Sequence, residues 1–122
     1  MGRDGLYLAN ATVLLTHQID AAFWHEWDLF RLPGGIQLFL VLNLPLILGV
    51  LYGLQALAVG RRSGIAWSWV LVGAGLFAAA FHTICLWRGD QAFRLPTSIA
   101  LLVLTFVLSL LQAVALVSGR RV

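Results

Sequence analysis

Residues 36–59 read IQLFLVLNLPLILGVLYGLQALAV, a run that contains no charged side chain. A helix needs about 20 consecutive apolar residues to cross the hydrocarbon core of a membrane, which is about 30 Å thick. Backbone amides inside lipid must be bonded within their own segment, and this favours a helix over a single strand. The run therefore predicts a membrane-spanning helix.

Three further segments share this character, and prolines, glycines and charges separate them. The four predicted spans are Leu6–Trp24, Ile36–Val59, Ala66–Trp87 and Thr97–Val117. The 122 residues are 61% hydrophobic and 11% charged, whereas a soluble domain carries about 25% charged residues. A soluble domain of this length could not bury so much apolar surface. We therefore predict an all-α membrane protein, with residues 1–122 as a single transmembrane domain that forms a four-transmembrane-helix bundle in the lipid bilayer.

The arginines set the predicted orientation. One side would hold Arg3, Arg61, Arg62, Arg120 and Arg121, and the other Arg31, Arg88 and Arg94. The second group is mixed with acidic side chains, so the positive-inside rule places both termini in the cytoplasm. The net charge of +3 comes from scattered arginines rather than a basic stripe, which excludes a nucleic-acid-binding face. The lone cysteine excludes an intrachain disulfide.

Short motifs recur in the same order in the two halves of the chain. Phe30-Arg31-Leu32-Pro33 recurs as Phe93-Arg94-Leu95-Pro96, and Gly60-Arg61-Arg62 recurs as Gly119-Arg120-Arg121. These matches predict a 2+2 parallel internal repeat of residues 1–62 and 63–122, with a pseudo-twofold axis along the membrane normal. The alternative is that the two halves share only helix boundary signals, since in both a helix starts after proline and ends at arginine.

Ionisable side chains at membrane depth are costly and commonly mark a functional site. Asn10, His17 and Asp20 are spaced to lie on one face of the first span. If the halves are a repeat, His17 faces His82, and Asp20 and Cys85 take matching places one turn away. Asp20 lies about 6 Å of helix rise from Trp24, so we expect this group in the outer half of the bilayer.

Four interpretations of this polar group remain open. As a metal site, His17, Asp20, His82 and Cys85 offer ligand types that suit zinc or another transition ion. As a haem site, the two histidines would be axial ligands. As a ligand- or proton-binding site, Asp20 would fix the tautomer of His17, with Asn10 on the same face. As a structural pair, His17 and Asp20 would bond each other and fix helix packing.

The segment Trp24–Phe30 places aromatic and ionisable side chains just outside the first span. His25 and Glu26 are candidate catalytic groups, an acid and a base in a lid over the polar pocket. The alternative is an interfacial aromatic belt whose charges lie among the lipid headgroups.

The runs His17-x-x-Asp20, His25-Glu26-Trp27 and Leu32-Pro33-Gly34-Gly35 resemble a group of short bacterial four-span membrane proteins of unknown function. The similarity extends to His82-Thr83 and Pro96-x-Ser98-Ile99. This resemblance implies a protein of the bacterial inner membrane. It implies no activity, cofactor or substrate.

Three functions follow as hypotheses. The first is a small, non-enzymatic membrane protein with an outer-leaflet polar site for a small ligand, a metal ion or a proton. The second is an accessory or structural subunit, within a homo-oligomer or a larger membrane complex. The third is a membrane enzyme acting on a lipid or quinone, with His17, Asp20, His25 and Glu26 as acid–base groups.

Overall fold

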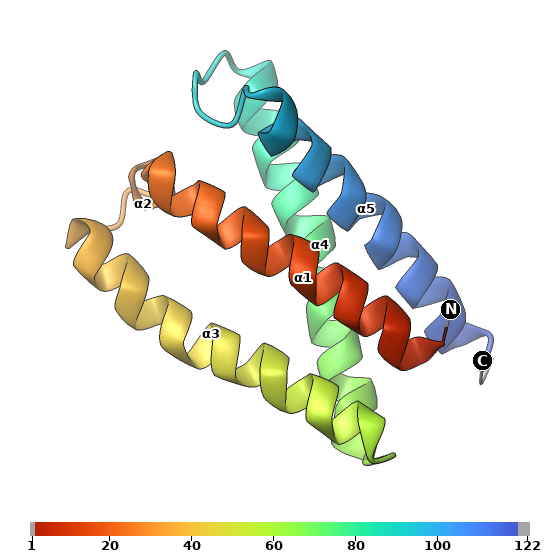
Figure 1. Cartoon of the computed structure of the whole chain (residues 1–122). Coiled ribbons are helices and arrows are strands. Elements are labelled where there is room, and N and C mark those ends of the chain that lie inside the picture. Colours follow the sequence, from red (N-terminus) through yellow and green to blue (C-terminus); the bar gives the residue numbers. More distant parts are fainter. Residues whose placement is uncertain (1, 120–122) are drawn as a thin grey trace.

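Residues 2–119 form four long helices and one single-turn helix (Figure 1). The computed structural model describes residues 2–119. The helices are α1 (Arg3–Phe23), α2 (Glu26–Leu29), α3 (Gly35–Ala58), α4 (Arg62–Trp87) and α5 (Pro96–Val117). No strand occurs within residues 2–119, so the all-helical prediction is confirmed. Each long helix overlaps one of the predicted spans.

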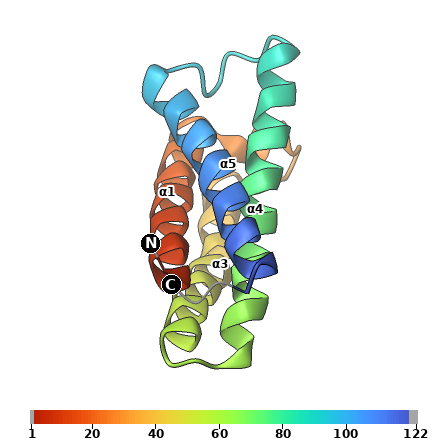
Figure 2. The same cartoon turned by 90° about the vertical axis from the view of Figure 1, so that its right-hand side faces the viewer.

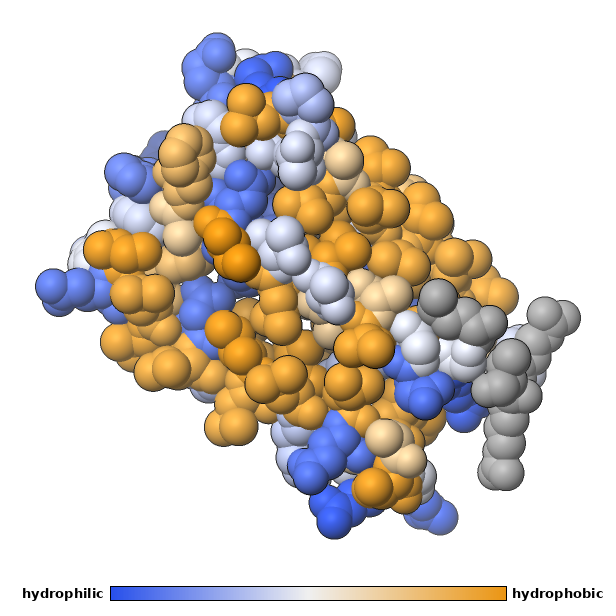
Figure 3. All heavy atoms as spheres, in the orientation of Figure 1, coloured by the Kyte–Doolittle hydropathy of each residue, from blue (hydrophilic) through white to orange (hydrophobic). Residues whose placement is uncertain are grey.

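Three of these helices, α3, α4 and α5, are long and apolar enough to cross a membrane. Their apolar side chains largely face outward, and only 11% of the most apolar stretch of α3 is buried inside the protein. Figure 3 shows the resulting hydrophobic surface over much of the molecule. Soluble monomers rarely expose an apolar surface of this extent, whereas lipid chains cover such a surface in a membrane. The length and composition of these three helices indicate a membrane protein.

Helix α1 differs from the other three long helices. It spans 21 residues, yet its composition does not place it among the apolar candidates for a span. Its sequence includes Asn10, His17 and Asp20, together with charged residues in its first turn. The prediction of four spans is thus supported for three helices, and the crossing by α1 belongs to the proposal below.

The long helices pack as a ring of neighbours. Helix α1 contacts α3, α4 and α5, while α4 contacts both α3 and α5. Figure 2 shows the start of α1, the end of α5 and the α3–α4 turn at one end of the molecule, with α2 and the α4–α5 loop at the other. Arg3, Arg61 and Arg62 therefore share one end, whereas Arg120 and Arg121 lie outside the described residues. The cytoplasmic location of that end remains a prediction.

A polar cluster joins α1 to α5 inside the helix ring. Asn10 is fully buried, and its side chain bonds to three side chains of α5. Those partners are Thr105, Ser109 and Gln112, each at most 2% exposed. Gly75 of α4 lies against Ser109 and Thr105, and its lack of a side chain lets α4 approach α5 there. Next to this cluster, Tyr7 donates a hydrogen bond to the Val50 carbonyl at 2.7 Å.

The two Phe-Arg-Leu-Pro copies adopt different local structures. In the first copy the left-handed residue is Arg31 (φ 55°), and in the second it is Phe93 (φ 64°). The Phe30 side chain is 38% exposed, while Phe93 is 1% exposed. One physical reason is that the first connection contains the extra helix α2, which has no counterpart in the loop between α4 and α5. The internal repeat therefore remains a prediction.

Candidate functional site

A sharp chain reversal after α1 brings an acidic residue back into the protein. His25 adopts the left-handed conformation (φ 53°, ψ 53°), which costs an ordinary residue about 1–2 kcal/mol. The reversal starts α2 immediately, so Glu26 points inward and is only 9% exposed. The His25 ring itself stays outside, stacked on Trp27 at a centroid distance of 4.8 Å.

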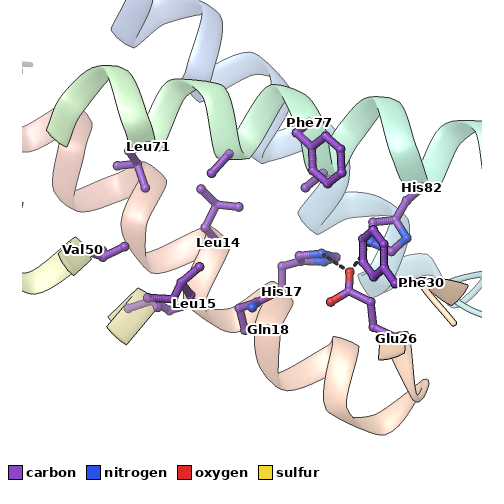
Figure 4. Close-up of a pocket in the computed structure, with 13 residues that line it drawn as sticks. Leu14, Leu15, His17, Gln18, Glu26, Phe30, Val50, Leu71, Phe77 and His82 are labelled. Atoms are coloured by element: carbon purple, nitrogen blue, oxygen red, sulfur yellow. Dashed lines mark hydrogen bonds and ion pairs between the residues drawn. The ribbon is translucent and has the colours of Figure 1, made fainter. Parts of the chain in front are cut away.

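Glu26 meets two histidines that come from different long helices. Its Oε1 atom lies 2.8 Å from Nε2 of His82 on α4 and 3.9 Å from Nε2 of His17 on α1. Both histidines are 1% exposed. One ligand atom from each of the three residues lies within 4.8 Å of the other two. Figure 4 shows the three side chains converging on one point from α1, α2 and α4.

Phe93, from the loop between α4 and α5, covers one side of this cluster. Its ring centroid lies 4.1 Å from that of His82 and 5.5 Å from that of His17. Phe93 also has a left-handed backbone (φ 64°), which persists only where its surroundings fix the residue. The contacts with both imidazoles and the near-complete burial of the ring provide that fixation.

A cavity of about 230 Å³ lies beside the cluster (Figure 4). The two histidines, Glu26 and Gln18 form its polar part. Its apolar lining comes from α1, α3, α4 and the residue that follows α2, and comprises Leu14, Leu15, Phe30, Leu46, Val50, Leu71, Ala74, Phe77 and Ala78. Phe30 stacks on Phe81 at 4.4 Å between ring centroids. The cluster thus combines a buried polar centre with an adjoining apolar space.

The structure brings together some of the predicted site residues and separates others. His17 and His82 face each other, with ring centroids 4.9 Å apart. Asp20 is half-buried outside this cluster, and no hydrogen bond joins it to His17 within residues 2–119. Its Oδ2 atom is buried without a partner. Cys85 is also half-buried and lies outside the cluster. The third member of the cluster, beside the two histidines, is Glu26.

The remaining candidates lie elsewhere. Asn10 belongs to the α1–α5 polar cluster, seven residues and about 10 Å of helix rise from His17. His25 points outward, with its side chain 64% exposed. Sequence reasoning assigned Glu26 to a lid and not to the histidine pair. The available signal was an acidic residue only a few positions beyond the end of an apolar helix.

The histidines also carry unused hydrogen-bonding capacity. Nδ1 of His17 and Nδ1 of His82 are both buried without a partner among the described residues. The Nε2 atoms face Glu26, so each ring uses one nitrogen within the cluster. An imidazole that ligates a metal ion through Nε2 carries its proton on Nδ1.

The model of a family of unknown function, DUF6713, matches residues 4–119. The chain belongs to this family. The expectation of a family of unknown function is therefore confirmed. No curated protein and no solved structure matches the chain significantly. The match to DUF6713 covers all three residues of the buried cluster and leaves their role to be inferred from their geometry.

Proposed function

We propose that this chain is an integral membrane protein that binds a transition metal ion through His17, Glu26 and His82. The observation that carries the proposal is the convergence of three buried ligand atoms, all within 4.8 Å of one another. Ionisable side chains are rarely buried at membrane depth without a charge partner or a bound species. Two imidazoles and a carboxylate form a donor set that a divalent ion satisfies directly.

The donor set restricts the class of metal. Two histidines and one glutamate ligate catalytic zinc, and two histidines with a carboxylate ligate non-haem iron. Both types of site leave coordination positions open. Ligands at about 2.0–2.2 Å from an ion lie roughly 3–3.5 Å from each other. The present separations from Glu26 Oε1 are 2.8 and 3.9 Å, and all three ligand atoms lie within 4.8 Å of one another, so binding an ion would draw the side chains closer together.

The same geometry argues against a haem between the two histidines. Axial ligation would place iron and the porphyrin ring between the two imidazoles. The Glu26 carboxylate occupies that position, within 3.9 Å of both Nε2 atoms. A direct proton-handling role is the second candidate, and the 2.8 Å hydrogen bond between Glu26 and His82 favours it.

The proposal treats α1 as the fourth span. Asn10 and His17 face the neighbouring helices rather than the outer surface, since they are 0% and 1% exposed. The face of a helix that packs against other helices can carry polar residues that a lipid-facing surface cannot. With four spans and the arginine-rich end inside, both termini are cytoplasmic. The metal site then lies in the outer half of the inner membrane.

Metal titration of the purified protein tests the proposal. We expect one Zn²⁺ or Co²⁺ ion per chain in mild detergent, and at least a tenfold loss of affinity in Glu26→Gln and His82→Ala. The chain offers matched controls, because Asp28 shares α2 with Glu26, and His25 is the remaining histidine. Their side chains are 71% and 64% exposed.

Asp28→Asn and His25→Asn should therefore bind metal like the unmodified protein, because asparagine also tolerates the left-handed backbone of residue 25. Circular dichroism would establish that each variant retains its helices. The proposal fails if the folded protein binds no ion, or if the control variants lose as much affinity as the cluster variants. Unchanged metal binding in Glu26→Gln and His82→Ala would likewise assign the ion to another site.

A further inference from the structure

We infer that the cavity beside the cluster binds a single-chain alkyl carboxylate. Its head would contact the metal ion held by His17, Glu26 and His82, and its chain would lie toward Val50 and Leu71. The head-group contact rests on the metal site proposed above. The cavity itself does not depend on the ion, because it is present among the protein side chains alone.

The dimensions of the cavity fit one thin molecule. Its lining on α4 runs from Leu71 to His82, which corresponds to about 16 Å of helix rise. Its volume of about 230 Å³ exceeds the 150 Å³ of an engineered apolar cavity that takes up benzene. At about 30 Å³ for each water-sized group, its volume corresponds to roughly eight groups. An alkyl chain of medium length has this size and shape.

The lining divides into a polar end and an apolar remainder. The polar end consists of His17, Gln18, Glu26 and His82. Gln18 is fixed from the side, because its Nε2 atom donates to Oδ1 of Asn43 at 2.9 Å. The remaining lining residues are aliphatic or aromatic, so they offer no side-chain hydrogen bond. An occupant that satisfies both parts is polar at one end only.

Charge decides the chemistry of the polar head. Among the residues that line the cavity, a divalent ion beside the Glu26 carboxylate leaves one positive charge, since the Asp20 carboxylate is not part of the lining. Within residues 2–119, Glu26 is the only carboxylate that lines the cavity. A buried charge without compensation is strongly unfavourable, and an anionic oxygen ligand removes it while filling an open position on the metal. A carboxylate provides the charge and the donor atom together.

The position of the cavity indicates entry from the lipid. Its lining includes residues of both α1 and α3, and Figure 3 shows the surface hollowed along the line between these helices. Phe30 stands at the edge of the cavity, 38% exposed, and stacks on Phe81. Phe93 covers the histidines on another side. An alkyl chain dissolved in the bilayer can enter sideways without crossing water.

The absorption spectrum of Co²⁺-loaded protein provides the test, because it responds to each new ligand on the ion. We expect octanoate to change the spectrum to saturation at a concentration at least tenfold lower than acetate. Ala74→Phe would fill the cavity from α4 without touching the three ligands. This variant should retain Co²⁺ and its response to acetate, while the preference for octanoate disappears.

Ala80→Phe is the matched control, because Ala80 lies on the same helix but does not line this cavity. It should behave like the unmodified protein. Equal responses to octanoate and acetate, or a preference that survives in Ala74→Phe, would overturn the inference and leave the metal site intact. Failure to bind Co²⁺ at all would overturn the proposed function, and the inference would fall with it.

Discussion

Replacing Asn10 by alanine should weaken the attachment of α1 to α5. The Asn10 Nδ2 atom donates to Ser109 Oγ and to Gln112 Oε1, both at 3.0 Å. Its Oδ1 atom accepts a hydrogen bond from Thr105 Oγ1 at 2.9 Å. Asn10→Ala removes all three bonds and leaves the buried side chains of Thr105, Ser109 and Gln112 without these partners.

The expected loss follows from the number of bonds. Side-chain hydrogen bonds between membrane helices contribute about 0.6 kcal/mol on average and about 1.7 kcal/mol at most. Three such bonds give a loss of about 2 kcal/mol, with an upper bound of about 5 kcal/mol. Thr12 supplies the control, because its exposed hydroxyl bonds only to the Leu8 carbonyl of its own helix. Thr12→Ala should change the unfolding free energy by less than about 0.5 kcal/mol.

Reversible unfolding in mixed micelles, with a rising fraction of denaturing detergent, measures these free energies. Tryptophan fluorescence reports the transition. A double-mutant cycle of Asn10→Ala with Ser109→Ala should give a coupling energy of about 0.6 kcal/mol. The reasoning is refuted if Asn10→Ala costs no more than Thr12→Ala, or if the coupling energy is zero.

Two further predictions concern packing and orientation. Gly75→Ala should destabilise the protein by about 1–3 kcal/mol, because the new methyl group would overlap Ser109. A methyl group added at Gly73, two residues earlier, meets open space, so Gly73→Ala should be neutral or stabilising by up to about 1 kcal/mol. If detergent unfolding shows Gly73→Ala to be less stable than Gly75→Ala, the packing of α4 against α5 is contradicted. In a Cys85→Ser background, a membrane-impermeant maleimide on intact cells should label Gln91→Cys and not Ser63→Cys. Labelling of Ser63→Cys alone would invert the proposed orientation.

The helical architecture is predictable because lipid imposes it. Long runs without charge, such as residues 36–59, must bond their own backbone, and the matching helix α3 covers Gly35–Ala58. Pro96 at the first position of α5 and the Gly-Arg junction before α4 mark helix boundaries. Helix α1 is harder to predict as a span, because its composition is less apolar. Its buried polar residues, such as Asn10 and His17, are explained by packing against the other helices.

The site is only partly predictable, because its third residue depends on a local turn. His17 and His82 could be paired from the sequence because they take matching places in the predicted repeat, and the structure shows both of them buried. Asp20 and Cys85 each follow a histidine by three residues, which rotates them by about 60° around the helix axis. Glu26 reaches the cluster only because His25 adopts φ 53° and reverses the chain. Sequence periodicity carries no signal for such a reversal.

The bond between Asn10 and α5 has a consequence for assembly in the cell. Asn10 is separated from Thr105, Ser109 and Gln112 by 95, 99 and 102 positions. A ribosome therefore completes α1 long before any of these partners has been made. Until α5 arrives, the Asn10 amide must be accommodated by water, lipid headgroups or the insertion machinery. Helix α1 is synthesised before α3, α4 and α5, yet its polar contact with α5 forms only after all three have been made.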